Sequence, residues 1–245
     1  MTSSGGGHRP DISMRQAALI AATCLLVMSA LSPVGFFYLF PRLIARADIL
    51  QTSQNIQAHQ GLFLAGIFCY LVTFICDILV AWALYVFLRP ASASLSMLVA
   101  WFRLAYASMA LVALLKLVTV LRVVRTSEYL DAFGRNLQNA QIQLLLISFR
   151  YDWAFSMIVF GVHLGFLGYL VYRSGYVPKL LAALLAINGL AYLIDTLRPY
   201  LFPATALPYL PVLFFGELIF MLWLFFWGSK IQDPVADVVP IRATP

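Results

Sequence analysis

The chain has 245 residues, of which 62% are hydrophobic and only 11% are charged, with a mean hydropathy of +0.89. Soluble domains carry about 25% charged residues, so this composition excludes an ordinary soluble globular protein and favours an integral membrane protein. The formal net charge of +6 would suggest nucleic-acid binding in a soluble protein, but here the basic residues mostly flank apolar runs without interleaved aromatic residues, so no nucleic-acid partner is predicted.

The amino-terminal segment, residues 1–16, is polar and rich in Ser and Gly, and it is predicted to be disordered. An apolar run follows over residues 17–40. Small residues near Ser29 resemble the cleavage region of a signal peptide. The run continues without a polar break, however, so we favour an uncleaved first spanning helix, in which Pro33 and Gly35 predict a kink.

Five further apolar runs are each long enough to cross the roughly 30 Å hydrocarbon core of a bilayer as a helix. They cover residues 61–88, 95–121, 153–172, 180–197 and 210–227. The predicted fold is therefore all-α, a polytopic membrane helical bundle with about six transmembrane helices and the lipid bilayer as its surroundings. A single transmembrane domain, residues 17–228, holds these helices, and a polar tail follows over residues 229–245.

The connections between the predicted helices differ in length. Short linkers after the second and fourth helices predict antiparallel neighbours. The first and third connections, residues 41–60 and 122–150, are long. Asp48 and Ser127 are candidate caps of short interfacial helices within them, and a solvated connector is the equal alternative.

Seven Lys and Arg residues lie outside the predicted spans on each side of the bundle, so their number alone does not set the orientation. Arg15, Arg89, Arg173 and Lys179 lie in or beside short connections on the side of the amino terminus. The positive-inside rule gives most weight to such positions. Both termini are therefore predicted to be cytoplasmic.

Ionisable residues inside the apolar runs predict a polar cluster in the bundle interior, because an unpaired charge in lipid is costly. At 1.5 Å per residue, Asp77 and Arg103 lie about 16 and 12 Å from the turn of their predicted hairpin, so they form a predicted ion pair. His163 and Glu217 fall in the same layer, about 13 and 15 Å from the ends of their helices. Tyr106 shares a helix face with Arg103. These five residues form the predicted cluster.

A secondary polar stripe is predicted nearer the opposite membrane face. Asn188, Tyr192 and Asp195 follow one another at helical spacing in the fifth helix, and Asp152 lies in the fourth. Asp195 is closer in depth to Lys116 and Asp152 than to the polar cluster. Lys116 is expected to reach the interface.

Small residues in the fourth predicted helix indicate close helix packing. Gly161 and Gly165 form a GxxxG motif, and Gly168 follows. This motif flanks His163. Close approach of a neighbouring backbone is expected to seat the imidazole.

Three interpretations of the polar cluster remain open. It is a structural ion network, a site that binds or moves a small polar solute or proton, or the centre of an intramembrane enzyme acting on a lipid or lipophilic substrate. In the last case His163 would be the acid/base and Asp77 or Glu217 its partner. No metal or cofactor is predicted, because Arg103 in the same layer disfavours an added cation, although His163, Asp77 and Glu217 offer suitable ligands. If His163 is protonated, the negative charges of Asp77 and Glu217 balance the positive charges of Arg103 and His163.

The non-enzymatic interpretation is favoured over an enzyme. The sequence contains no GxSxG motif, P-loop, metal-binding box or dinucleotide fingerprint. A structural or regulatory membrane subunit remains a further alternative.

The chain contains, in this order, the strings WFRLAYA, FGVHLGFLGYLVYRSGYVPK, GLAYLIDTLRP and FFGELIFMLWLF. Together they resemble an uncharacterised family of bacterial six-helix membrane proteins, classed as a domain of unknown function, over residues 14–228. AYLID stands where GYLID is commoner in that family. The resemblance implies the six-helix fold and a bacterial inner-membrane location, and it implies no activity. The family motif residues match Asp77, Arg103, His163, Tyr169, Arg173, Gly175, Asp195 and Glu217.

Overall fold

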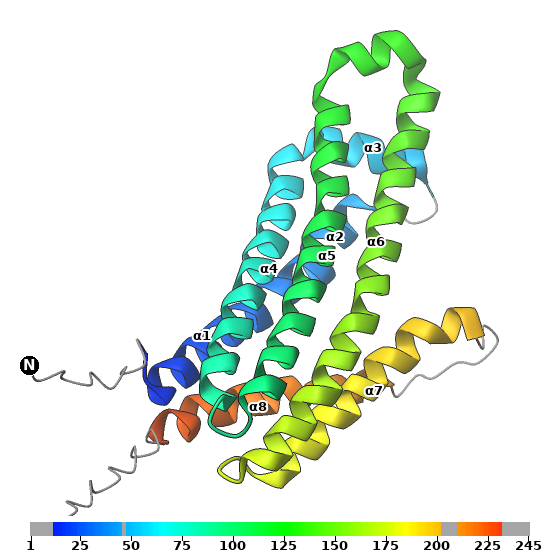
Figure 1. Cartoon of the computed structure of the whole chain (residues 1–245). Coiled ribbons are helices and arrows are strands. Elements are labelled where there is room, and N and C mark those ends of the chain that lie inside the picture. Colours follow the sequence, from blue (N-terminus) through cyan, green and yellow to red (C-terminus); the bar gives the residue numbers. More distant parts are fainter. Residues whose placement is uncertain (1–11, 46–47, 202–209, 232–245) are drawn as a thin grey trace, which may run out of the picture.

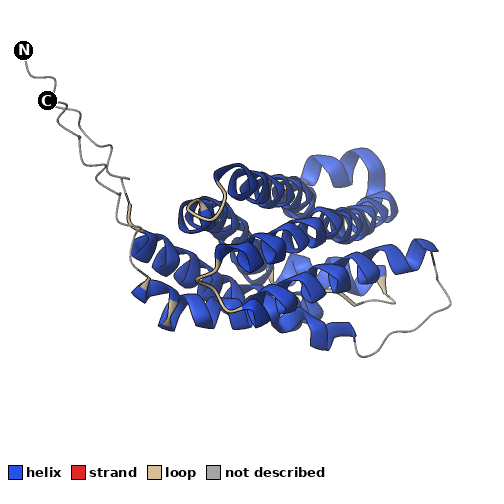
Figure 2. Cartoon of the chain, turned by 60° about the horizontal axis from the view of Figure 1, so that its bottom comes forward, coloured by secondary structure: helices blue, strands red, loops and turns tan. Residues whose placement is uncertain are grey.

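The structure, a computed structural model, describes residues 12–45, 48–201 and 210–231, and within them all regular secondary structure is helical (Figure 2). The longer helices are α1 (Met14–Pro33), α3 (Ile49–Ala58), α4 (Gln60–Leu88), α5 (Ala93–Arg125), α6 (Ser127–Ser174), α7 (Lys179–Leu201) and α8 (Gly216–Phe226). Shorter elements complete the chain: the π-helix η1 (Val34–Leu39), α2 (Phe40–Leu43) and the 3-10 helices η2 (Leu210–Phe215) and η3 (Gly228–Lys230).

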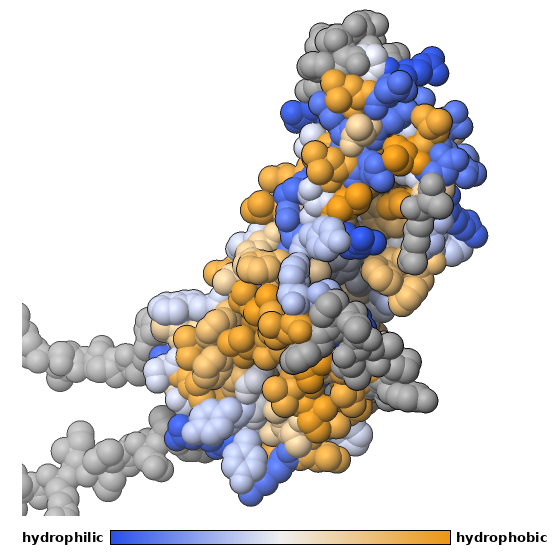
Figure 3. All heavy atoms as spheres, turned by 90° about the vertical axis from the view of Figure 1, so that its right-hand side faces the viewer, coloured by the Kyte–Doolittle hydropathy of each residue, from blue (hydrophilic) through white to orange (hydrophobic). Residues whose placement is uncertain are grey.

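Six helical segments are long and apolar enough to cross a membrane. They are Met14–Leu43, Gln60–Leu88, Ala93–Arg125, Gly134–Ser174, Lys179–Leu201 and Leu213–Lys230. The predicted all-α, six-helix bundle is thereby confirmed, and the chain is a multi-pass membrane protein. Apolar side chains accordingly cover much of the lower body of the molecule (Figure 3).

The six spanning segments form a ring. Each of α4, α5, α6 and α7 packs against its neighbour in sequence, and α8 closes the ring against both α7 and α1 (Figure 1). Around this ring of six segments, α5 and α8 lie opposite each other. The short helix η3 that follows α8 meets the start of α1, since a Cβ on Gly228 would lie 3.5 Å from the Cβ of Ala18.

Helix α1 begins earlier than predicted. Ser13 Oγ accepts a hydrogen bond from the Gln16 backbone N–H at 3.2 Å, and Gln16 Oε1 accepts from the Ser13 backbone N–H at 2.9 Å. This capping box starts the helix at Met14, so the predicted disordered segment 1–16 is too long at its carboxyl end. Residues 1–11 lie outside the described part of the chain, as do residues 232–245 of the predicted tail.

The predicted interruption of the first spanning segment is present. The chain is π-helical directly after Pro33, over Val34–Leu39. Pro33 has no N–H to donate, which favours such a local unwinding. Gly35 lies in this stretch against Tyr70 of α4, where a Cβ would meet the ring at 3.4 Å.

The two long connections differ from each other. The predicted helix after Asp48 is present as α3, because the Asp48 side chain accepts from the Gln51 N–H at 2.9 Å. In the connection over residues 122–150 the helical alternative is confirmed and the solvated connector is wrong, with a break in the helix at Gly134, whose φ is 72°. Helix α5 runs to Arg125, and α6 starts at Ser127 with Thr126, not Ser127, at its cap position.

An amphipathic pattern explains why residues 134–150 are helical. Gln138, Ile142 and Phe149 are buried at helical spacing on one face of α6. Gln138 Nε2 donates to the Val123 carbonyl of α5 at 3.0 Å. Of the polar residues in this stretch, Arg135 and Asn136 are exposed on the outer face, whereas Gln138 and Asn139 are buried.

Helices α5 and α6 extend past the bilayer. At 1.5 Å per residue α5 and the 134–174 part of α6 are about 50 and 60 Å long, against a hydrocarbon core of about 30 Å. Hydrophilic side chains gather at this upper end of the molecule (Figure 3). Helix α3 packs there against α5 and α6.

Candidate functional site

Arg103 of α5 lies at the centre of the polar cluster. Its Nε donates to Asp77 Oδ1 of α4 at 3.0 Å, and its Nη1 donates to Glu217 Oε1 of α8 at 2.6 Å. Nη2 lies 2.7 Å from the same Asp77 oxygen without hydrogen-bond alignment, so that contact is electrostatic. The predicted Asp77–Arg103 pair is confirmed, and one guanidinium joins three helices across the ring.

Burial differs within this network. The side chains of Asp77 and Arg103 are 0% exposed, whereas Glu217 is 18% exposed. Asp77 Oδ2 is buried and has no hydrogen-bond partner among the described residues. Glu217 therefore forms the outer edge of the cluster, and Asp77 its innermost acid.

His163 of α6 is held in one tautomer by its two contacts. Its Nδ1 lies 2.9 Å from the Val99 carbonyl oxygen, which only accepts, so Nδ1 carries the proton. Its Nε2 lies 3.4 Å from Arg103 Nη1, which only donates, so Nε2 presents its lone pair. A second proton on the ring would face the guanidinium. His163 is consequently neutral here, unlike the protonated imidazole considered from the sequence.

An aromatic shell surrounds the guanidinium and the imidazole. The Phe160 ring stacks on His163 with centroids 5.7 Å apart, and Arg103 Cζ lies 5.5 Å from the Phe160 centroid. Tyr106 contacts the same ring at 4.7 Å, and Tyr192 of α7 contacts it edge-on at 5.2 Å. Tyr106, predicted in the cluster, and Tyr192, predicted in the secondary stripe, thus both reach it through Phe160.

Glycines let the helices that carry the cluster approach closely. A Cβ on Gly161 of α6 would lie 2.8 Å from the Gly189 carbonyl oxygen of α7. On Gly168 it would lie 2.8 Å from the Ala182 carbonyl oxygen. The predicted close packing is confirmed at Gly161 and Gly168, whereas a Cβ on Gly165, the second glycine of the motif, would meet nothing within 4 Å. Gly216 meets α7 in the same way, which fixes the position of the adjacent Glu217.

The structure does not bring the secondary polar stripe together as one site. Asp152 pairs with Lys116 of α5. Asp195 pairs with Arg198 on its own helix, with Oδ1 and Nη2 3.9 Å apart. Asn188 is buried, and its Nδ2 donates to the Phe214 carbonyl at 3.4 Å.

The remaining residues singled out by the resemblance lie at the membrane edge. Arg173 Cζ lies 6.0 Å from the Tyr169 ring centroid, four residues earlier on α6. Gly175 ends α6 with φ +74°, a left-handed conformation that favours glycine. These positions shape the end of the helix and the short turn that follows it.

Two partners of His163 were missed from the sequence. Phe160 precedes it by three residues and so shares its helix face, a signal that was available. Val99 contributes only a backbone carbonyl, which no sequence pattern marks.

The cluster holds two carboxylates against one guanidinium and one neutral imidazole. With both acids ionised its net charge is −1, and a proton on either acid makes it neutral. Among the described residues no group of three or more His, Cys, Asp or Glu is arranged to hold a metal ion. The chemistry that the arrangement itself offers is the uptake and release of a proton.

Comparisons with known proteins give a family without an activity. A family model described as a domain of unknown function (DUF4386) matches residues 20–228. The chain is similar to a protein of Archaeoglobus fulgidus that bears the name "Uncharacterized protein", with 36% identity over 173 residues, covering 71% of this chain and 88% of that protein. No solved structure matches the chain.

Proposed function

This chain belongs to the DUF4386 family of proteins with a domain of unknown function, and we propose that it is a non-enzymatic membrane protein whose polar cluster binds and releases one proton. The observation that carries the proposal is the pairing of Asp77 and Glu217 with the single guanidinium of Arg103. The sequence leaves open a site for a small polar solute or for a proton, and we propose the proton.

The proton is needed because of where the cluster lies. A net charge buried in a low-dielectric interior costs several kcal/mol. A proton bound by one carboxyl group would cancel the net charge of the cluster and so remove about that cost. Arg103 remains charged, and a second proton on His163 would face it. Asp77 and Glu217 are left as the groups that share the proton.

Glu217 is the group through which the proton is exchanged. It is the one member of the ion network with an exposed side-chain fraction, 18%. Asp77 itself is fully buried. Exchange through Glu217 therefore needs no opening of the bundle around Asp77.

An intramembrane enzyme is supported less well. Both ring nitrogens of His163 are engaged, one with the Val99 carbonyl and one with Arg103. A general base needs a lone pair within reach of the substrate, and here that lone pair faces a guanidinium.

Infrared spectroscopy tests the proposal. We expect wild-type protein, titrated in lipid, to show the carbonyl stretch of one protonated carboxyl group that disappears as the pH rises. Asp77→Asn and Glu217→Gln should each abolish this band, because either change leaves one acid for one guanidinium. Asp152→Asn, outside the cluster, should retain it.

Two results would overturn the proposal. A wild-type protein without a titrating carboxyl band would make the cluster a fixed structural ion network. A band that persists in both Asp77→Asn and Glu217→Gln would come from another carboxyl group.

We further propose that the protein resides in a bacterial inner membrane with both termini in the cytoplasm. Exposed basic residues lie at the end of the ring where α1 begins and α8 ends, including Arg15, Arg89, Arg173 and Lys179. The positive-inside rule places that end in the cytoplasm. A reporter that is active only in the cytoplasm, fused after residue 245, should be active, and an inactive fusion with normal expression would reverse the orientation.

A further inference from the structure

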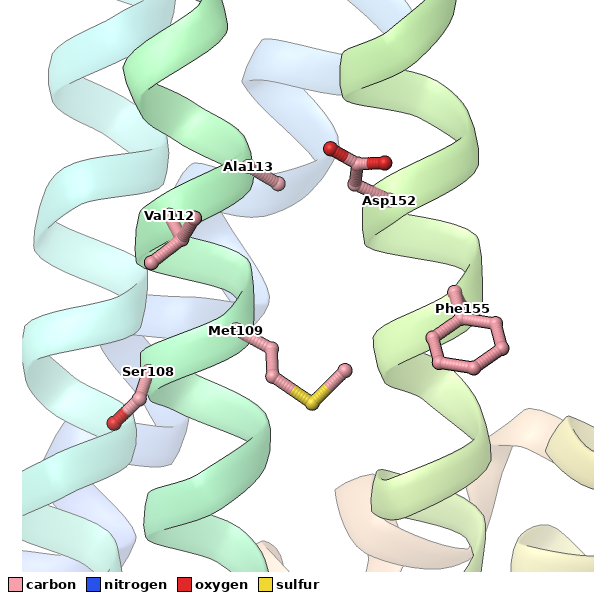
Figure 4. A pocket seen from close by; sticks show the side chains of 6 residues that line it. All are labelled: Ser108, Met109, Val112, Ala113, Asp152 and Phe155. Carbon is pink, nitrogen blue, oxygen red and sulfur yellow. The ribbon is translucent and has the colours of Figure 1, made fainter.

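A groove between α5 and α6 lies apart from the polar cluster. Its volume is about 420 Å³, within the range of small-molecule sites, about 300–1,000 Å³. It is lined by Ser108, Met109, Val112, Ala113, Asp152 and Phe155 (Figure 4). Ala113 is buried, whereas Val112 and Phe155 are more than half exposed, so the groove has a small floor and open, apolar walls.

An ion pair marks the upper end of this groove. Asp152 points from α6 toward α5 beside Ala113 (Figure 4) and pairs with Lys116. The side chains of Lys116 and Asp152 are 29% and 45% exposed, so both charges still reach the surroundings. The charges of a buried structural ion pair would not reach the surroundings.

The depth of the pair matches a lipid headgroup. Lys116 lies 23 residues after Ala93, the first residue of α5, which is about 35 Å at 1.5 Å per residue. The hydrocarbon core is about 30 Å thick. Lys116 and Asp152 therefore lie where headgroups meet acyl chains, and the apolar walls extend from there into the hydrocarbon.

We propose that this groove binds a phospholipid whose headgroup carries a phosphate and a primary ammonium, as in an ethanolamine phospholipid. An acyl chain lies against Met109, Val112 and Phe155. The phosphate approaches Lys116, and the lipid ammonium approaches Asp152.

Charge complementarity selects this headgroup. The lipid phosphate and ammonium lie opposite Lys116 and Asp152, respectively. The four charges then alternate in sign around a square, so each charge attracts both of its neighbours. A glycerol headgroup leaves Asp152 facing an uncompensated phosphate. A choline headgroup has the positive charge but no N–H to donate to the carboxylate.

Lipid binding to the full-length, delipidated protein in detergent tests the proposal. Phosphatidylethanolamine, phosphatidylcholine and phosphatidylglycerol with identical acyl chains are added in turn, and bound lipid is counted by native mass spectrometry. We expect phosphatidylethanolamine to bind about three- to fivefold more tightly than the other two, the gain of one partly exposed charge pair.

Two variants locate the site. Asp152→Asn should remove the preference for ethanolamine while leaving an acyl-chain site. Asp195→Asn is the matched control, since Asp195 is also a partly exposed acid paired with a basic residue but does not line the groove. It should keep the wild-type preference. Lys116→Gln removes the phosphate partner and should weaken the binding of all three lipids, since each of them carries a phosphate; this variant tests the site if Asp152→Asn does not fold.

The proposal is overturned if the three lipids bind equally to wild-type protein, because the groove then holds lipid by its apolar walls alone. It is also overturned if Asp152→Asn keeps the ethanolamine preference, or if Lys116→Gln binds all three lipids as tightly as the wild type. Since none of these variants touches the polar cluster, the result is independent of proton binding there.

Discussion

Helix α5 carries two basic side chains, Arg103 and Lys116, in very different surroundings. Arg103 is fully buried and contacts groups on α4, α6 and α8, whereas Lys116 is partly exposed and pairs with one acid on α6. They lie 13 residues apart, about 20 Å along the helix. The low dielectric of the interior makes the inner charge expensive to leave unpaired, while water and headgroups compensate the outer one. The depth of each basic residue in the membrane, more than its charge, therefore decides whether it needs buried ion-pair partners.

The largest effect is expected on removing the inner charge. Arg103→Gln leaves Asp77 and Glu217 buried without their cation, and breaking a buried pair in this way typically costs about 3–5 kcal/mol. The free energy of unfolding can be measured by titration with a denaturing detergent in mixed micelles. A loss below about 1 kcal/mol would place Arg103 in the same class as an exposed pair.

A double-mutant cycle separates the pair from general damage at the site. The variant that combines Asp77→Asn with Arg103→Gln should lose less stability than the two single variants summed, with a coupling of about 0.5–3 kcal/mol. Additive losses would show that the two side chains do not stabilise each other.

A smaller effect is expected from moving the helix that carries His163. In Gly189→Ala the new Cβ would lie 2.6 Å from the Gly161 carbonyl oxygen and 3.0 Å from the Gly165 nitrogen, so α6 must shift. Overpacking of this kind costs about 1–3 kcal/mol. Gly165→Ala is the matched control, because its Cβ would meet nothing within 4 Å. Equal losses for both variants would argue against a specific α6–α7 contact.

Tyr176, in the turn between α6 and α7, is intermediate between the two surroundings. Its hydroxyl donates to the Phe87 carbonyl at 2.8 Å, so Tyr176→Phe should cost about 0.5–1.5 kcal/mol at neutral pH. Tyr200→Phe, at a largely exposed tyrosine, should cost much less. The same unfolding titration measures both.

The contribution of Tyr176 should depend on alkaline pH. Burial raises the pKa of the Tyr176 phenol above its ordinary value of about 10. The stabilisation is therefore complete below about pH 10 and decreases as the pH rises toward the folded-state pKa, because the unfolded chain loses its proton first. The stability difference between wild type and Tyr176→Phe should shrink over that range, and a constant difference would contradict the buried hydrogen bond.

The smallest effect is expected at the outer pair. Lys116→Gln should lower the free energy of unfolding by about 0.2–1 kcal/mol in detergent without added lipid, the usual range for exposed pairs. A loss comparable to that of Arg103→Gln would remove the distinction between the two charges of α5.

Much of the polar cluster was predictable because helices convert residue number into depth. The 1.5 Å rise per residue places Asp77, Arg103, His163 and Glu217 in one layer, and the structure joins them through the guanidinium. The tautomer of His163 was not predictable, because its partner is the backbone carbonyl of Val99. A backbone group has no residue-specific signal.

The extent of the fourth spanning helix was not predictable from apolar runs either. Residues 134–150 mix polar and apolar side chains, and the burial of Ile142 and Phe149 becomes visible only once the neighbouring helices are in place. The centroid of the Phe149 ring, for example, lies 5.8 Å from that of the Tyr70 ring of α4. Likewise, Asp152 and Asp195 shared a depth in the sequence, but each took a partner close by in space. Depth follows from sequence, whereas the angular position around the ring requires the packed helices.

The closure of the ring by its last helix also sets an order of assembly during synthesis. Glu217 follows Arg103 by 114 residues, which at about 5–20 residues per second is a delay of about 6–23 s. During that interval Asp77 and Arg103 enter the membrane as a neutral pair, and His163 adds no charge. The negative charge that the proposed proton site requires arrives with α8, so under this proposal the nascent bundle binds a proton only after α8 inserts.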